Sequence, residues 1–225
     1  MGLGSLAAGA AVNAAAKKIE MNQHLKGRTP EQQKVIKYFY GAKGCLSKGM
    51  SDQEYESMVL AKAKSIDFKQ KALGKIGLDE SQVNEVAPIH FENYLFDDKK
   101  AFALRGNDSI WRSSMYQISW IFASTTHIYV YQYTFNMDED GKKESTEEYA
   151  YKNISGFATS TDTVEKEVVS KVSCSGKTTY IRTSVDSNLF VLSAMGDKFK
   201  CAMKQDDYTE KAIQGIKAKL REKQS

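Results

Sequence analysis

The sequence predicts an α+β protein in which a helical segment precedes an antiparallel β unit that ends in a C-terminal helix. Capping signals at Thr29 and Ser51 each precede apolar residues at helical spacing. From Tyr116 to Phe135, apolar and aromatic residues instead recur at every second position, which is typical of strands. After Asp207 the helical spacing returns. These changes of period divide the chain into an N-terminal arm (1–28), a helical segment (29–87) and a β unit with its C-terminal helix (88–225).

The arm begins with sixteen residues that are mostly Gly and Ala. It has no basic residue before its apolar run, as a secretory signal would need, and Leu6 stands where N-myristoylation needs Ser or Thr. Two interpretations stay open. The arm is either flexible or weakly helical, or it forms a small-residue helix that rests on a partner or a membrane surface.

The helical segment has two clear starting points. Thr29 provides an N-cap, Pro30 occupies the first helical position, and the helix should run to about residue 40 with its apolar residues facing inward. Ser51 and Glu54 form a second capping box, after which helical spacing continues to Ile66. A short turn or helix is expected over 79–86, and Pro88 should close the segment.

The stretch 112–151 is expected to form three consecutive antiparallel strands at the centre of the β unit. Its second strand carries bulky side chains on both faces, so it should be central and covered on both sides. The segment 89–98 predicts an earlier strand, and 101–105 a short one. Further strands are expected at 155–160, 164–174, 178–183 and 189–194, with a hairpin turn at Ser175-Gly176. The C-terminal helix should cover one face with Ala212, Ile213, Ile216 and Leu220.

Charge and cysteine content exclude several classes of protein. Residues 1–86 contain 13 Lys and Arg against 9 Asp and Glu, whereas the remainder is balanced. This mild excess does not predict a nucleic-acid partner but permits contact with an anionic membrane surface. The three cysteines, Cys45, Cys174 and Cys201, show no C-x-x-C spacing, which favours reduced thiols in a cytoplasmic protein over disulfides or structural zinc. No apolar stretch reaches the length of a membrane-spanning helix.

One segment matches the spacing of a calcium-binding EF-hand loop. Its ligand positions would be Asn136, Asp138, Asp140 and Glu147, with Gly141 at the turn. The first ligand is Asn rather than Asp, Lys143 stands where an apolar residue is usual, and the flanking segments are strands. We therefore expect an acidic hairpin loop and no metal site.

No catalytic set of residues stands out. His24, His90 and His127 share no ligand spacing, and Cys174 has no base assigned to it. The glycines around Cys45 form neither a P-loop nor a dinucleotide fingerprint. The sequence therefore predicts a protein that is not an enzyme and needs no cofactor.

The order of about seven antiparallel strands and one amphipathic helix resembles the pleckstrin-homology-like (PH-like) superfold. The segment Glu147–Ile154 is similar to a step seen in bacterial PH-like and GRAM-like domains, where a strand crosses into the second sheet. The resemblance covers Ile89 to Lys223 and implies an antiparallel barrel or sandwich capped by the C-terminal helix. Domains of this family that bind phosphoinositides use basic residues around the first hairpin. The comparable residues are Lys99, Lys100, Arg105 and Arg112, although Ile110 interrupts the basic-x-Arg pattern.

Tyr129, Tyr131 and Tyr133 form an aromatic ladder along the second central strand. We expect it to serve in cross-strand packing, with a ligand-binding platform as the alternative. The resulting hypothesis is a cytoplasmic, non-catalytic module that binds another protein at a sheet edge or a helix–sheet groove. The alternative is a peripheral membrane protein that contacts anionic lipid through its arm and basic residues.

Overall fold

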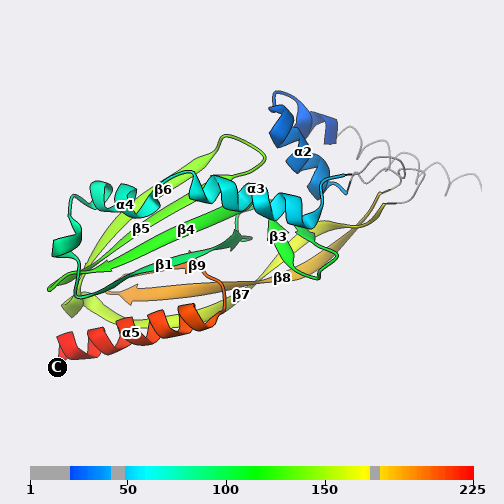
Figure 1. Cartoon of the computed structure of the whole chain (residues 1–225). Coiled ribbons are helices and arrows are strands. Elements are labelled where there is room, and N and C mark those ends of the chain that lie inside the picture. Colours follow the sequence, from blue (N-terminus) through cyan, green and yellow to red (C-terminus); the bar gives the residue numbers. More distant parts are fainter. Residues whose placement is uncertain (1–20, 42–48, 173–177) are drawn as a thin grey trace, which may run out of the picture.

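The structure is a computed structural model that describes residues 21–41, 49–172 and 178–225. Within these residues the strands form a four-stranded sheet of order β1-β4-β5-β6, a two-stranded sheet β2-β3 and a three-stranded sheet β7-β8-β9. All the strand pairs of these sheets are antiparallel. Helices α2, α3 and α4 lie on one side of the four-stranded sheet, while the three-stranded sheet and helix α5 lie on the other (Figure 1). The predicted α+β class is confirmed.

Helices α2 (Pro30–Phe39) and α3 (Asp52–Lys64) begin where the capping signals predicted. Thr29 and Ser51 each accept a hydrogen bond from the third helical backbone N–H, and the side chain at that position bonds back to the cap. Val35, Ile36 and Phe39 are buried, as expected. The described chain also has a helical turn at residues 21–25, before α2.

The second helix ends earlier than predicted. Its expected continuation to Ile66 is wrong, because α3 stops at Lys64 and Asp67 caps a separate helix, α4 (Phe68–Ile76). The expected short helix is η1 (Glu80–Gln82). Pro88 does not close the segment either: it lies inside β1 (Val86–Leu95), where the register shifts. Proline is tolerated there because β1 is an edge strand of its sheet.

The central hairpin consists of β4 (Met115–Ala123) and β5 (His127–Asn136), and β6 (Lys142–Ala150) pairs with β5. β5 lies between β4 and β6, as its bulky side chains predicted. The stretch predicted to form these three strands began at Arg112, but this residue does not belong to the four-stranded sheet. Residue 112 lies in β3 (Trp111–Ser113), which pairs with β2 (Ala103–Arg105) in the small separate sheet.

The last sheet has fewer and longer strands than predicted. The four expected segments merge into β7 (Ile154–Val172) and β8 (Thr178–Ala194), which form one long antiparallel ribbon. A distinct β9 (Asp197–Ala202) pairs with the end of β8, and the short helix η2 (Tyr151–Asn153) precedes β7. The expected turn at Ser175-Gly176 lies outside the described residues, as do the first twenty residues, Cys45 and Cys174.

Two hydrophobic cores lie on opposite faces of the four-stranded sheet. The first joins α2, α3 and α4 to side chains such as Tyr116, Phe122 and Tyr131, so the helical segment is packed on the sheet. The second fills the space between the two larger sheets with Ile121, Ile128 and residues of the last strands. Helix α5 (Asp207–Gln224) closes this second core, as predicted, with Ile213, Ile216 and Leu220.

The two larger sheets do not close into a barrel in the described part of the chain. They remain separate and face each other through the second core, as shown by the Phe91 and Phe190 rings, whose centroids are 5.1 Å apart. None of the described helices has the length and apolar content that crossing a bilayer requires.

Candidate functional site

A cleft of about 620 Å³ opens between the two larger sheets. Its floor is formed by β4 and β5, and its walls by the β1–β2 loop, the β5–β6 hairpin, and strands β8 and β9. The apolar residues of the lining are Leu95, Met115, Leu189 and Phe199. A volume of this size suits a ligand of several tens of atoms or a short peptide segment.

The floor of the cleft is polar, although it continues the face that carries the second core. Gln117, Thr134 and Asn136 are all more than nine-tenths buried, and Gln132 is half-buried beside them. Gln132, Thr134 and Asn136 occupy alternate positions of β5, and Gln117 pairs with Thr134 across the sheet, so these side chains share one face. Further along the same face lie Ile121, Ile128 and Val130, which are apolar and buried.

The two glutamines connect the floor to the edge of the other sheet. Gln117 Oε1 accepts a hydrogen bond from the backbone N–H of Ala202 at 2.7 Å, and Gln132 Nε2 donates to the Lys200 carbonyl at 2.9 Å. Gln117 Nε2 also donates to Thr134 Oγ1 at 3.2 Å. These bonds satisfy backbone groups of the edge strand β9, which would otherwise be open to pairing with another strand. The two glutamines therefore link the four-stranded sheet to β9 at the floor of the cleft.

Asn136 is fixed from several directions and still has one group without a partner. Its backbone carbonyl accepts from Lys62 Nζ at 2.7 Å, and its Nδ2 donates to Glu139, which Arg28 holds in an ion pair at 3.0 Å. Its Oδ1 is buried and has no hydrogen-bond partner among the described residues. An unpaired buried acceptor costs about 1–3 kcal/mol, so a ligand with an N–H or O–H group would gain by reaching it.

The rim of the cleft carries charges of both signs. Five lysines (Lys100, Lys142, Lys143, Lys198, Lys200) stand against four carboxylates (Asp97, Asp98, Glu139, Glu147). Lys143 lies directly opposite Thr134 across β5 and β6, on the face of the floor. Lys200 is paired with Asp162 at 3.0 Å. The rim therefore has almost no net charge, which suits a ligand that is itself mixed in charge.

The four basic residues suggested by the family resemblance are not brought together at this cleft. Lys99 and Lys100 are exposed in the loop before β2, and only Lys100 lines the cleft. Arg105 lies at the end of β2, where its Nε donates to the Ser109 carbonyl at 3.3 Å. Arg112 is 1 % exposed and lies on β3.

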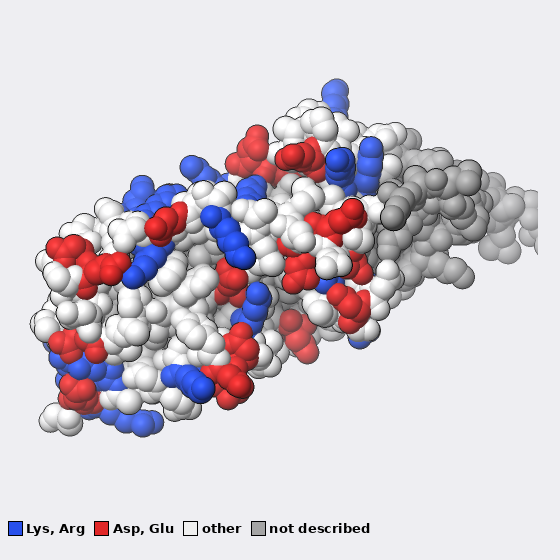
Figure 2. All heavy atoms as spheres, viewed as in Figure 1, with Lys and Arg blue, Asp and Glu red and all other residues white. Residues whose placement is uncertain are grey.

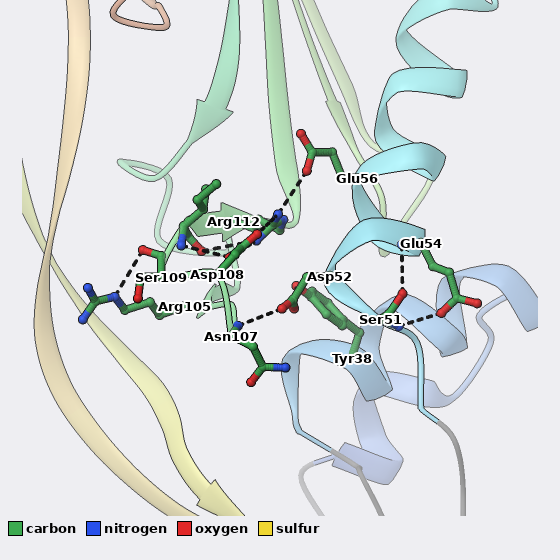
Figure 3. Close-up of polar contacts among 11 residues, drawn as sticks. Tyr38, Ser51, Asp52, Glu54, Glu56, Arg105, Asn107, Asp108, Ser109 and Arg112 are labelled. Atoms are coloured by element: carbon green, nitrogen blue, oxygen red, sulfur yellow. Dashed lines mark hydrogen bonds and ion pairs between the residues drawn. The ribbon is translucent and has the colours of Figure 1, made fainter.

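Arg112 is occupied by carboxylates of the protein itself (Figure 3). Its Nη1 and Nη2 donate to the two oxygens of Asp108 at 2.9 and 2.7 Å, and Nη2 also donates to Glu56 at 3.0 Å. Hydrogen bonding to Arg112 lowers the pKa of Asp108 to about 2. A Cβ on Gly106 would lie 2.6 Å from both Arg112 Nη1 and Asp108 Oδ1, so a larger residue at this position would displace the ends of these two side chains. The guanidinium thus joins helix α3 to the β2–β3 hairpin.

The tyrosine ladder lies on the face of the four-stranded sheet that the helices cover. Tyr131 is fully buried and donates to Glu144, while Tyr133 contacts the Phe68 ring of α4 at a centroid distance of 5.0 Å. Lys71 Nζ lies 4.3 Å from the centroid of the Tyr133 ring, and Tyr129 is half-buried. In this arrangement the ladder makes packing contacts on the opposite side of the sheet from the cleft.

The segment with calcium-loop spacing forms the β5–β6 hairpin. Glu147 pairs with Val130, six residues before Asn136, so the last candidate ligand lies about 20 Å along the strand from the first. Asp140 accepts a hydrogen bond from Gln32 at 2.7 Å, and burial raises the pKa of Asp138. The four candidates therefore do not surround one point.

Sequence reasoning missed the floor of the cleft. Gln117, Gln132 and Thr134 were not considered as binding residues, and Asn136 was considered only as a candidate calcium ligand. One signal in the sequence could have identified the floor. Because β5 was expected to be covered on both faces, the polar side chains at its alternate positions should also have been expected to be buried. A row of buried amides and a hydroxyl indicates either internal hydrogen bonds or a ligand.

The chain matches no protein-family model, no curated protein and no solved structure.

Proposed function

We propose that this protein is a non-catalytic binding module that receives an extended segment of another protein in the cleft between its two sheets. The observation that carries the proposal is Asn136, a residue of the cleft lining whose buried Oδ1 has no hydrogen-bond partner among the described residues. Its neighbours on the floor are uncharged groups that form hydrogen bonds and do not ionise near neutral pH. Such a floor is suited to holding a ligand by hydrogen bonds.

The spacing of the floor favours an extended peptide as that ligand. Gln132, Thr134 and Asn136 follow one another at intervals of two residues, or about 6.8 Å, along β5. In an extended peptide, backbone amide groups that point in the same direction repeat at the same interval. Successive side chains of the floor can therefore meet successive peptide groups of the ligand, while the rim meets its charged side chains.

Membrane binding, the alternative function, has less support from the distribution of charge. The face drawn in Figure 2 shows Lys and Arg interspersed with Asp and Glu. The rim of the cleft is likewise balanced, whereas binding to anionic lipid needs an excess of positive charge. The proposal includes a cytoplasmic location, where the buried, unpaired thiol of Cys201 would stay reduced.

Kinship with PH-like domains is also part of the proposal. The sheet β1-β4-β5-β6, the following sheet β7-β8-β9 and the final helix α5 occur in the order expected for that superfold. The separate β2-β3 sheet would then be an insertion after the first strand.

The proposal can be tested by panning a display library of random peptides against the full-length protein. Enriched peptides would be labelled, and their dissociation constants measured by fluorescence anisotropy. Asn136→Leu removes the unpaired acceptor, and Thr134→Val removes the adjacent hydroxyl at nearly constant shape. We expect each substitution to weaken binding about tenfold, the effect of losing one or two hydrogen bonds to the ligand.

Asn153→Leu is the matched control, because Asn153 is exposed on η2, away from the cleft lining. This variant should bind like the wild type. If no peptide is enriched, or if enriched peptides bind both floor variants with wild-type affinity, the cleft is not the binding site.

A further inference from the structure

Three side chains form a line of polar contacts that begins just before helix α2 and ends in the lining of the cleft. Arg28 Nη2 lies 3.0 Å from Glu139 Oε2, and Asn136 Nδ2 donates to the other carboxylate oxygen, Oε1, at 2.8 Å. Glu139 and Asn136 both line the cleft. One carboxylate therefore connects a guanidinium of the N-terminal part of the chain to a side chain of the floor.

The arginine end of this line is held by helix α2, which lies beside the β5–β6 hairpin (Figure 1). The Arg28 carbonyl accepts a hydrogen bond from Gln33 Nε2 at 3.1 Å. Gln32 of the same helix donates to Asp140 of the hairpin at 2.7 Å. The side chains of Arg28 and Glu139 are only 27 and 29 % exposed, so their ion pair is partly shielded from solvent.

The asparagine end is fixed by the hairpin and by helix α3. The Asn136 N–H donates to the Gly141 carbonyl at 3.1 Å, and the Asn136 carbonyl accepts from Lys62 Nζ at 2.7 Å. A Cβ on Gly141 would lie 3.1 Å from both Asn136 Nδ2 and Glu139 Oε1, which is a tight contact. The glycine therefore leaves room for the bond between these two side chains.

The Glu139 carboxylate determines which way round the Asn136 amide lies. An amide group has a donor side and an acceptor side, which exchange places when the group rotates by half a turn. A carboxylate accepts hydrogen bonds and donates none, so it can bond to Nδ2 but not to Oδ1. Rotation would lose a charge-assisted bond, which is about twice as strong as a neutral one. Oδ1 therefore stays turned away from Glu139, buried and without a partner among the described residues.

We propose that Glu139, held in place by Arg28, is a positioning residue that sets the specificity of the cleft. By fixing the amide, it makes Asn136 a hydrogen-bond acceptor, so the ligand must offer a donor at this point. The inference rests on the proposed function and narrows the partner. The peptide group that meets Asn136 must present its N–H rather than its C=O, and proline, which has no backbone N–H, is excluded there.

The residues beside this acceptor can make way for a ligand. Lys142 and Lys143 line the cleft and are exposed. They lie opposite Phe135 and Thr134, the two residues that precede Asn136 on the neighbouring strand. The long, flexible stem of lysine allows both side chains to move aside as a peptide enters.

The orientation of the amide can be tested on the free, full-length protein by NMR. In a nitrogen–proton correlation spectrum, the side-chain amide signals of Asn136 are identified by their loss in Asn136→Leu. Their exchange with solvent should be about tenfold faster in Glu139→Gln and in Arg28→Gln, which weaken one hydrogen bond. Arg28→Lys keeps a cation at this place and should restore slow exchange.

Glu80→Gln is the matched control, because Glu80 is also bound to a cation and to a side-chain amide. Lys69 Nζ lies 2.8 Å from its carboxylate, and Gln70 Nε2 donates to it at 3.1 Å. Glu80 does not belong to the cleft lining. This variant should leave the Asn136 signals and peptide binding unchanged.

The specificity is tested with an enriched peptide in which each backbone N–H is methylated in turn. Methylation at one position should weaken binding to the wild type and to Glu80→Gln about tenfold. The same methylation should have no effect on binding to Asn136→Leu or Glu139→Gln, because neither variant presents the fixed acceptor.

The outcomes separate this inference from the proposed function. Peptides whose binding depends on Thr134 and Asn136, but whose methylation penalties all persist in Glu139→Gln, would leave the function standing and refute the inference. Unchanged Asn136 signals in Glu139→Gln would refute it as well. If no peptide is enriched, the proposed function fails, and the claim about the ligand fails with it.

Discussion

Arg112 shows how one residue connects parts of the chain that are distant in sequence. The guanidinium comes from the small sheet, one of its carboxylate partners from the adjoining turn and the other from helix α3. Nearby, Asn107 N–H donates to Asp52 at 2.8 Å, and Tyr55 of α3 donates to the Ser113 carbonyl at 2.6 Å. The cost of burying this charge is offset by the ion pairs and hydrogen bonds of Nη1 and Nη2, whereas Nε has no hydrogen-bond partner among the described residues.

The Asp108–Arg112 pair should make stability depend on pH in the acid range. The folded protein holds the pKa of Asp108 at about 2, whereas an unfolded aspartate has a pKa of about 3.9. Its contribution to the free energy of unfolding is therefore fully present above about pH 4 and is lost as the pH falls toward 2. The difference in unfolding free energy between wild type and Asp108→Asn, measured with urea, should shrink over that interval.

The control is the same substitution in an Arg112→Met background. Without the guanidinium, backbone hydrogen bonds, chiefly that from the Ile110 N–H, still lower the pKa of Asp108, so the pH-dependent part of the effect of Asp108→Asn should become smaller. A pH-dependent difference of undiminished size in this background would show that Arg112 is not its source.

At the scale of elements, helix α5 depends on a local cap. Asp206 accepts a hydrogen bond from the Thr209 N–H at 2.8 Å, and this bonding lowers the pKa of Asp206. Asp206→Ala should reduce the free energy of unfolding by about 1 kcal/mol, the usual contribution of an N-cap. Asp207→Ala tests the neighbouring carboxylate, which lies in the first turn but does not form the cap bond.

Thermal unfolding of the two variants would check this expectation. The cap variant should have the lower melting temperature. If Asp207→Ala is as damaging as Asp206→Ala, the charge at the helix N-terminus matters more than the cap bond.

The elements that could be predicted from sequence are those specified by neighbouring residues. Thr29, Ser51 and the stripe of α5 fix helices through contacts within a few positions, and the sequence therefore locates them. The lengths of β7 and β8 were missed because Thr, Ser and charged residues interrupt their alternation, and pairing between the two strands maintains the ribbon. The end of α3 at Lys64 was missed because helical spacing continues to Ile66.

The candidate site was harder to predict, since it depends on which sheet faces which. The polarity of Thr134 and Asn136 is visible in the sequence, but their burial comes from β9 and the β5–β6 hairpin, which are brought there by the fold. Arg112 was selected as a binding residue through the family resemblance. Its partner Glu56 is fifty-six positions away, so no local pattern indicated that the two residues form an ion pair.

At the scale of the whole molecule, the four-stranded sheet is shared by both hydrophobic cores. Adjacent residues of β4 illustrate this: Phe122 points into the core under the helices, and Ile121 into the core between the sheets. Both are almost completely buried. Loosening either core therefore removes support from the same strand, and we expect the helical and β parts to unfold together.

Phe122→Ala and Ile121→Ala test this expectation from the two sides. Each creates a cavity in one core and should lower the free energy of unfolding, by about 3–5 kcal/mol for the phenylalanine and about 2–5 kcal/mol for the isoleucine. Tryptophan fluorescence reports on the helix-covered side, since Trp111 and Trp120 both pack against the first core. Far-UV circular dichroism reports on the whole chain. The two signals should give coincident urea transitions in both variants. Separate transitions in Ile121→Ala, with the fluorescence change at higher urea, would instead show that the helices and the four-stranded sheet remain folded after the second sheet has detached.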